Sequence, residues 1–378
     1  MKILHIIVSL NVGGAENVLK RLIEYDPDHI PNTVIVSLST LGAIGINLRG
    51  QGVLVHALKM LPSGLNILPV LWRLVNLIRE LQPDIIQTWM YHADLIGGIA
   101  AYLTGHKNVI WGIRRTSVSF NDTKKTIYIL KICALLSHWL PKKIICVANA
   151  AKEAHINLGY DATKMVVIPN GFNFNQYKFD NEQRVKLRNA FLTKDNDLII
   201  GCVGRFHPDK GQDNFVKAAA LVTRNYPTVK FLLVGRDCDI NNINLTHLIS
   251  TYNLNHRFIL LGERNDISRC LSAMDIYCMP SRTEGFPNSL GEAMSISLPC
   301  VATNVGDTAI LTGNTAILVT PNDVSSLAQG LLDVLSLTKK QRLQMGKDAK
   351  EKIINEFSMD KMHARFFSVY DQLSAIKE

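Results

Sequence analysis

Short apolar runs alternate with longer helical patterns along the first 170 residues. The short runs are continuously apolar, which is typical of strands in a parallel sheet that is covered on both faces. Segments such as AENVLKRLIEY and ILPVLWRLVNLIREL place apolar residues at helical spacing between them. This alternation predicts a doubly wound α/β layer. Its predicted strands are KILHIIVSL, NTVIVSL, VLVHAL, DIIQTWM, NVIWGI, KIICVA and MVVIP.

A second α/β pattern begins after a polar, turn-rich stretch, IPNGFNFNQYKFDNEQ. We place the boundary at Asn170–Gly171, with a first domain at 1–170, a second at 171–358, and a helix at about 359–378 that packs back on the first. Two Rossmann-like doubly wound domains are expected to face each other across a cleft at the carboxyl ends of their strands. The predicted strands of the second domain are DLIIGCVGRF, VKFLLVG, RFILLG, MDIYCMP and PCVATN.

Composition limits the class of protein. The 378 residues leave room for two cores, and no uncharged apolar run is long enough to cross a bilayer. The start, MKILHIIVSL, leads directly into NVGGAEN without a cleavage pattern, so we interpret it as a buried strand and not a signal peptide. The seven cysteines form no C-x-x-C pair, which indicates reduced thiols in a cytoplasmic protein.

The net charge of +9 is concentrated in the first domain. Residues 1–170 contain 17 Lys and Arg against 10 Asp and Glu, whereas the remainder contains 24 against 22. This excess suits an anionic partner, or general solubility. The segment 113–144 mixes Lys and Arg with Ile, Leu, Tyr and Trp, which suits an anionic membrane surface as well as ordinary packing. No nucleic-acid motif accompanies the charge, so nucleic acid is not expected as a partner.

Two glycines follow the first predicted strand. Gly13 and Gly14, in SLNVGGAEN, precede a helix whose N-terminus favours an anion, and they would let the backbone approach a ligand. A plain tight turn is the alternative. The G-x-G-x-x-G fingerprint of dinucleotide binding is absent here, which argues against an NAD-dependent oxidoreductase.

The second domain contains charged residues at two strand ends. Arg205 and Lys210 follow its first strand in GCVGRFHPDKGQDNF and can neutralise a diphosphate. In SRTEGFPNSLGEAMS, Glu284 lies on a loop and Glu292 in the first turns of a helix whose free N–H groups form an anion site. Carboxylates on both sides of a phosphate site suit the hydroxyls of a sugar–diphosphate–nucleoside. Alternatively, Glu292 only complements the helix dipole.

These motifs, with IPNG and the N-terminal GGAE, resemble glycosyltransferase family 4, retaining enzymes of GT-B architecture, over nearly the whole chain. The resemblance implies that Glu284 lies near the donor sugar hydroxyls and Glu292 binds the ribose. It implies that Arg205 and Lys210 hold the donor diphosphate and stabilise its departure. The further donor-binding candidates are Gly204, Gly285, Phe286, Pro287, Asn288, Ser289, Leu290, and, for the nucleobase, Arg264 and Asn265 in LGERNDI.

The first domain resembles the family less closely at its candidate site. The segment QTWMYHADLIGGIAA is similar to a subgroup that acts in bacterial surface-polysaccharide assembly, and it makes His92 a candidate catalytic residue. Many family members carry a histidine after the fifth strand, where this chain has WGIRRTS, so Arg114 is the candidate for contact with donor or acceptor. After PNG, Asn173 replaces the usual acid.

No metal or other cofactor is expected. Two D-x-D strings, Asp26-Pro-Asp28 and Asp237-Cys-Asp239, are of the kind that holds a metal in other glycosyltransferases. The Arg205–Lys210 pair and the helix N-terminus already supply the positive charge that a diphosphate requires.

The expected activity is transfer of a hexose from a UDP- or GDP-sugar to a saccharide acceptor, lipid-linked, in bacterial polysaccharide or lipopolysaccharide biosynthesis. We expect the second domain to bind the donor and the first to present the acceptor, in a cytoplasmic enzyme that is peripheral on the inner face of the cell membrane. The alternatives are a nucleotide-sugar epimerase of the same fold and a non-catalytic protein that docks on the membrane.

Overall fold

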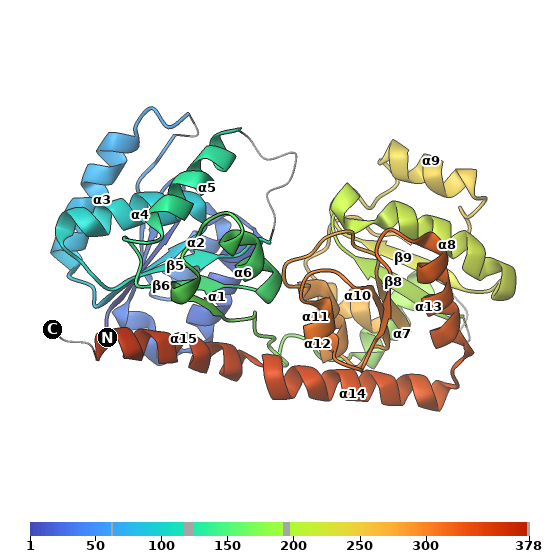
Figure 1. The fold of residues 1–378 in the computed structure, drawn as a ribbon. Helices are drawn as coiled ribbons and strands as arrows, with labels where there is room; N and C mark the ends of the chain where they lie inside the picture. Colours follow the sequence, from blue (N-terminus) through green and yellow to red (C-terminus); the bar gives the residue numbers. More distant parts are fainter. Residues whose placement is uncertain (62, 117–123, 192–196, 376–378) are drawn as a thin grey trace. The chain divides into compact units, whose positions relative to one another are not determined.

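The computed structural model describes residues 1–61, 63–116, 124–191 and 197–375. The chain forms two compact units, of which the first comprises Met1–Asn170 with Met359–Glu378 and the second comprises Gly171–Ser358. Each unit contains one parallel sheet with helices packed around it (Figure 1). The expected α/β fold with two Rossmann-like layers is confirmed.

The sheet of the first unit has the strand order β3-β2-β1-β4-β5-β6-β7, and all its pairs are parallel. The direction of the crossovers reverses between β1 and β4, which makes the carboxyl ends of these strands a topological switch point. Every residue of β1, β2, β4 and β5 is buried, which explains their continuously apolar sequences. The strands are β1 Ile3–Ile7, β2 Thr33–Ser37, β3 Leu54–Ala57, β4 Ile85–Trp89, β5 Val109–Ile113, β6 Lys143–Cys146 and β7 Met165–Val167.

The C-terminal helix belongs to the core of the first unit. Met362, Phe366 and Tyr370 of this helix are buried in one cluster with Leu19 and Leu22, which come from the first helix of the chain. The helices of this unit are α1 Gly14–Tyr25, α2 Gly42–Gly50, α3 Ile67–Leu81, α4 Tyr91–Thr104, α5 Lys124–Leu136, α6 Asn149–Ile156 and α15 Met359–Ser374, with the 3-10 turns η1 Pro27–Asn32 and η2 Ala162–Lys164.

The sheet of the second unit has the order β10-β9-β8-β11-β12-β13, again with all pairs parallel. Its switch point lies between β8 and β11. The strands are β8 Ile199–Val203, β9 Lys230–Val234, β10 Phe258–Leu260, β11 Ile276–Met279, β12 Cys300–Thr303 and β13 Ile317–Val319. The helices are α7 Asn181–Ala190, α8 Gln212–Asn225, α9 Ile243–Thr251, α10 Ile267–Ser272, α11 Asn288–Ser295, α12 Thr308–Thr312, α13 Val324–Ser336 and α14 Lys339–Phe357, with the 3-10 turn η3 Pro208–Lys210.

Within the described ranges, none of the helices is long and apolar enough to cross a bilayer. The same residues contain no group of three His, Cys, Asp or Glu side chains that could hold a metal ion.

Candidate functional site

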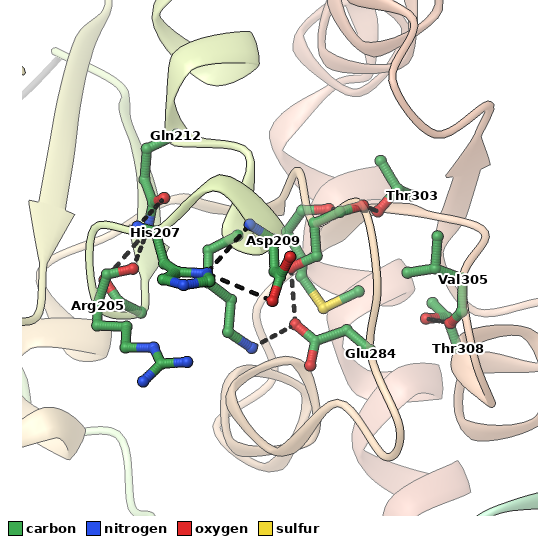
Figure 2. Close-up of polar contacts among 12 residues, drawn as sticks. Arg205, His207, Asp209, Gln212, Glu284, Thr303, Val305 and Thr308 are labelled. Atoms are coloured by element: carbon green, nitrogen blue, oxygen red, sulfur yellow. Dashed lines mark hydrogen bonds and ion pairs between the residues drawn. The ribbon is translucent and has the colours of Figure 1, made fainter. Parts of the chain in front are cut away.

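The turn after β8 lies against the end of β11 and places charged side chains there. Gly211 has φ +66°, and a Cβ at this position would lie 2.1 Å from the carbonyl oxygen of Pro280, so only glycine allows this approach. The Nε2 of Gln212 donates to the carbonyl oxygens of Arg205 at 2.7 Å and Gly204 at 3.2 Å (Figure 2). The turn that carries Arg205 and Lys210 is therefore fixed at both ends.

Lys210 and Glu284 form an ion pair between the β8 turn and the loop after β11. The Lys210 Nζ lies 2.7 Å from Glu284 Oε1, and the hydroxyl of Ser281 donates to the same oxygen at 2.7 Å. The Glu284 side chain is 9% exposed and that of Lys210 is 30% exposed. Two residues from separate sequence motifs thus meet at the switch point of the sheet.

Arg205 contributes a second cation to this end of the sheet. The residue is exposed, and no dashed line reaches its guanidinium in Figure 2. Within the part of the chain that the structure describes, this guanidinium makes no ion pair. It is available to an anionic ligand.

Arg282 joins the two loops, and the sequence analysis missed it. Its Nη1 and Nη2 donate to the two carboxylate oxygens of Asp213 at 2.8 and 2.7 Å, and its main-chain N–H donates to the main-chain carbonyl oxygen of Asp209 at 2.7 Å. Burial raises the pKa of Asp213, but the hydrogen bonds and charge of Arg282, together with the charge of Lys217, outweigh burial and leave the pKa lowered overall. The position of Arg282 at a strand end was the only signal in the sequence.

The loop of Glu284 rests on the segment after β12. Gly306 has φ +55°, and a Cβ there would lie 2.2 Å from the carbonyl oxygen of Glu284. The main-chain N–H of Asp307 donates to the carbonyl oxygen of Gly285 at 3.2 Å. Gly306 and Asp307 therefore support the loop, although the sequence analysis did not select them.

Helix α11 begins at Asn288, directly after the loop, as predicted. Pro287 caps the helix without a side-chain hydrogen bond, and the N–H of Asn288 donates to the carbonyl oxygen of Phe286 at 3.0 Å. The N–H groups of the first turn, which include those of Ser289 and Leu290, have no acceptor within the helix. Together with the helix dipole, they favour a negatively charged group at this end.

Phe286 anchors this loop to the rest of the second unit. Its ring stacks on Phe172 with centroids 6.1 Å apart and contacts Phe357 with centroids 5.7 Å apart. The main-chain N–H of Phe172 donates to the carbonyl oxygen of Phe357 at 2.8 Å. A Cβ on Gly291 of α11 would meet the Phe172 ring at 2.0 Å, so this glycine makes room for the ring.

Glu292 is buried in α11 and bound by a residue distant in the sequence. The hydroxyl of Tyr177 donates to Glu292 Oε1 at 2.7 Å, and both residues are under 10% exposed. Glu292 thus makes a specific tertiary contact in addition to any effect on the helix dipole. The sequence analysis missed Tyr177, because the contact depends on how α11 packs.

A cavity of about 680 Å³ adjoins Tyr177. Arg264 and Asn265 line it, together with Glu263 and Ile267. The Arg264 guanidinium donates to both carboxylate oxygens of Asp266, at 2.8 and 2.7 Å. The residues selected for a nucleobase therefore lie around one cavity, which Tyr177 connects to Glu292.

Three candidates lie in the first unit at the starts of α1 and α4. A Cβ on Gly13 would lie 2.3 Å from the Glu16 carboxylate, whereas one on Gly14 would meet open space. The Glu16 carboxylate thus lies beside the start of α1, and burial raises its pKa. His92 is the second residue of α4 and half-buried, and burial lowers its pKa, which favours the neutral imidazole.

Arg114 packs inside the first unit. Its guanidinium lies over the rings of Trp89, at 5.2 Å, and Phe366, at 5.8 Å, and its Nη2 donates to the Asn170 side chain at 3.0 Å. Its Nε and Nη1 are buried and have no hydrogen-bond partner among the described residues, and burial lowers its pKa to about 10. These contacts join β4, α15 and Asn170, the last residue of the first segment of this unit. Contact of Arg114 with a donor or acceptor stays a prediction.

Two family models match most of the chain. The family described as "Glycosyltransferase Family 4" matches residues 12–176, and the family described as "Glycosyl transferases group 1" matches residues 197–336. The chain is 29% identical over 307 residues to the UDP-Gal:alpha-D-GlcNAc-diphosphoundecaprenol alpha-1,3-galactosyltransferase of Escherichia coli, a match that covers 79% of this chain and 77% of the relative. It is 25% identical over 315 residues to the capsular polysaccharide biosynthesis glycosyltransferase CapM of Staphylococcus aureus, covering 80% of each.

Solved structures share the fold over the whole chain. Anabaena Alr3699/HepE in complex with UDP matches with a TM-score of 0.87 and 24% identity, covering 98% of this chain and all of that one. The same protein in complex with UDP-glucose matches with a TM-score of 0.84 and full coverage of both chains. At this level of identity the likeness establishes a common architecture.

Proposed function

The chain belongs to glycosyltransferase family 4, and from that premise we propose that it transfers a hexose, with retention, from a UDP-sugar to a lipid-linked saccharide during synthesis of a bacterial surface polysaccharide. The observation that carries the proposal is the Lys210–Glu284 pair beside Arg205 and the start of α11. The name of the Escherichia coli relative supports UDP over GDP in the donor and a diphosphate lipid in the acceptor.

In this proposal, the main catalytic effect is stabilisation of the negative charge on the leaving diphosphate. An ammonium has three donors, and one of those on Lys210 binds Glu284, so the others can bind phosphate oxygens. Arg205 and the N–H groups at the start of α11 add positive charge at the same end of the sheet. Such preorganised donors act on the charge that develops as the bond to the sugar breaks.

We assign hydrogen-bonding roles to the two acids. Oε1 of Glu284 accepts from Lys210 and Ser281, which suits an acid that orients a cation and sugar hydroxyls better than it suits a covalent nucleophile. Glu292, oriented by Tyr177 beside the cavity of Arg264 and Asn265, would bind the ribose while the cavity takes the base.

Transfer assays test the activity and its alternatives together. The purified chain is incubated with UDP-Gal, UDP-Glc or GDP-Man, with and without a short-chain GlcNAc-diphosphate lipid, and the products are resolved by mass spectrometry and NMR. We expect an α-linked product from a UDP-sugar only when the acceptor is present. A new nucleotide sugar formed from the donor alone would instead identify an epimerase.

A lysine variant tests the role of the pair. Lys210→Ala is expected to lower kcat by about 10²- to 10³-fold, the usual loss when one transition-state donor is removed. The exposed Lys347→Ala on α14 is the matched control and should turn over as the wild type does. The assignment of Lys210 would be contradicted if Lys210→Ala turned over as fast as the wild type, or if the wild type showed no turnover.

A further inference from the structure

Helices α3, α4 and α5 form one layer of the first unit, with α4 between the other two (Figure 1). Helix α4 lies close to the sheet, because a Cβ on Gly97 or Gly98 would press on Thr88 of β4 or Trp111 of β5. Residues of α3 and α5 that point away from this packing are therefore on the outer side of the layer.

Helix α5 presents a stripe in which lysine alternates with large apolar side chains. Its members are Lys124, Tyr128, Lys131, Leu135 and, just past the helix end, Trp139. They are spaced three or four residues apart, which places them on one face of a helix. All five residues are exposed, and the exposed fractions of the apolar three are between 61% and 69%.

Helix α3 adds a second set of exposed apolar residues at its start. Leu65 is 87% exposed, Leu68 73% and Trp72 68%, and the exposed Arg73 follows them. An ordinary soluble surface contains such residues singly, whereas several on two helices of one layer mark an interaction surface.

The charge of the two helices identifies the class of partner. Helices α3 and α5 together contain five Lys and Arg residues and one acid, Glu80. A second copy of the chain would bring lysine against lysine, which costs free energy. A nucleic acid would use the lysines but not the exposed leucines. A bilayer with anionic headgroups uses both, because Trp, Tyr and Leu enter the interface while the lysines contact phosphate.

We propose that the outer face of α3 and α5 docks on an anionic lipid bilayer. The proposal extends the function above, since it rests on an acceptor that is anchored in the membrane by its lipid. The docking surface is defined by Leu65, Leu68, Trp72, Arg73 and the α5 stripe.

Vesicle co-sedimentation of the full chain tests the proposal. We expect binding to vesicles of phosphatidylcholine with phosphatidylglycerol, and weaker binding to phosphatidylcholine alone. Each surface lysine contributes about fivefold to such binding, so Lys124→Ala combined with Lys131→Ala should weaken it by about 30-fold. Trp72→Ser combined with Trp139→Ser should weaken binding to both kinds of vesicle, because it removes the inserted rings.

Matched changes on α14 are the control. Leu343 and Lys347 are exposed there, and Leu343→Ser combined with Lys347→Ala should bind vesicles as the wild type does. The proposal is wrong if the wild type does not bind the anionic vesicles, or if the lysine variant binds them as well as the wild type does. Turnover of a water-soluble acceptor separates the two claims: vesicle binding without transfer would contradict the proposed activity and leave the docking surface standing.

Discussion

Tyr177 and Glu292 are 115 positions apart in the sequence and joined by one buried hydrogen bond. Such a contact fixes the direction of the carboxylate before a ligand arrives. A buried hydrogen bond to a charged group contributes more than a neutral one, and its loss leaves the carboxylate less well held. The phenol is therefore a positioning residue for the predicted ribose ligand.

Replacement of this phenol by a phenyl ring tests the role. Tyr177→Phe keeps the packing but removes the hydroxyl, so we expect the KM for the nucleotide sugar to rise about tenfold with kcat little changed, which corresponds to a net hydrogen-bond contribution of about 1.4 kcal/mol. Steady-state kinetics measure both constants. Tyr252→Phe, at an exposed tyrosine of the same unit, is the control. An equal fall in kcat and kcat/KM would mean that the hydroxyl acts in the transition state instead.

Asp94 makes the stability of the first unit depend on pH. Its Oδ1 accepts from Thr88 and from the N–H of Gly112, while the buried Oδ2 has no partner in the part of the chain that the structure describes. Burial raises the pKa of Asp94 from its ordinary value of 3.8 to about 7, so the folded state holds this proton more tightly than the unfolded state does. The free energy of unfolding therefore falls as the pH rises from about 4 to about 7, by up to about 1.4 kcal/mol per pH unit.

An amide at the same position removes this dependence. Urea unfolding of the wild type should give a lower free energy of unfolding at about pH 8 than at about pH 5, and Asp94→Asn should lose that difference. The comparison between the two proteins cancels the titration of other groups. Identical pH profiles would show that Asp94 is already ionised in the folded chain at the lower pH.

At the level of elements, the turn between β8 and α8 depends on one glycine. Gly211→Ala combines an unfavourable positive φ with a clash against the Pro280 carbonyl. Gly159→Ala, at φ +92° with open space around the new Cβ, costs only the backbone strain. We expect Gly211→Ala to destabilise the chain by about 2 kcal/mol more than Gly159→Ala does and to lower transfer activity, as thermal unfolding and kinetics would measure. Equal destabilisation by the two variants would mean that the loop moves away easily.

The strands and the start of α11 were predictable because they depend on local patterns. Continuous apolar runs predicted all seven strands of the first sheet and five strands of the second. The strand β13 was missed, since it has only three residues, two of them half-buried. Arg282, Gly306 and Tyr177 were missed for another reason: their contacts depend on which strands are neighbours, and strand order cannot be read from a run of apolar residues.

At the level of the whole molecule, each unit has its own hydrophobic core. All four tryptophans, Trp72, Trp89, Trp111 and Trp139, belong to the first unit, whereas the proposed donor site lies in the second. Tryptophan fluorescence therefore reports unfolding of one unit, and circular dichroism reports both.

This separation predicts a selective effect of the nucleotide. UDP at about 100 times its Kd should stabilise the second unit by about 2.7 kcal/mol. We expect the denaturation transition seen by circular dichroism to shift partly to higher denaturant, while the fluorescence transition stays in place. A matching shift in fluorescence would show that the two cores unfold as one.

Phe286 has a consequence for anyone who would exchange donor specificity between relatives by grafting this loop. The Phe286 ring, two residues after Glu284, contacts both Phe172 and Phe357. These two residues lie next to the first and last residues of the second unit. A transplanted loop with a smaller residue at position 286 would leave a void against Phe172 and Phe357. The loop should therefore be exchanged together with Phe172, Phe357 and Gly291, the glycine of α11 that makes room for the Phe172 ring.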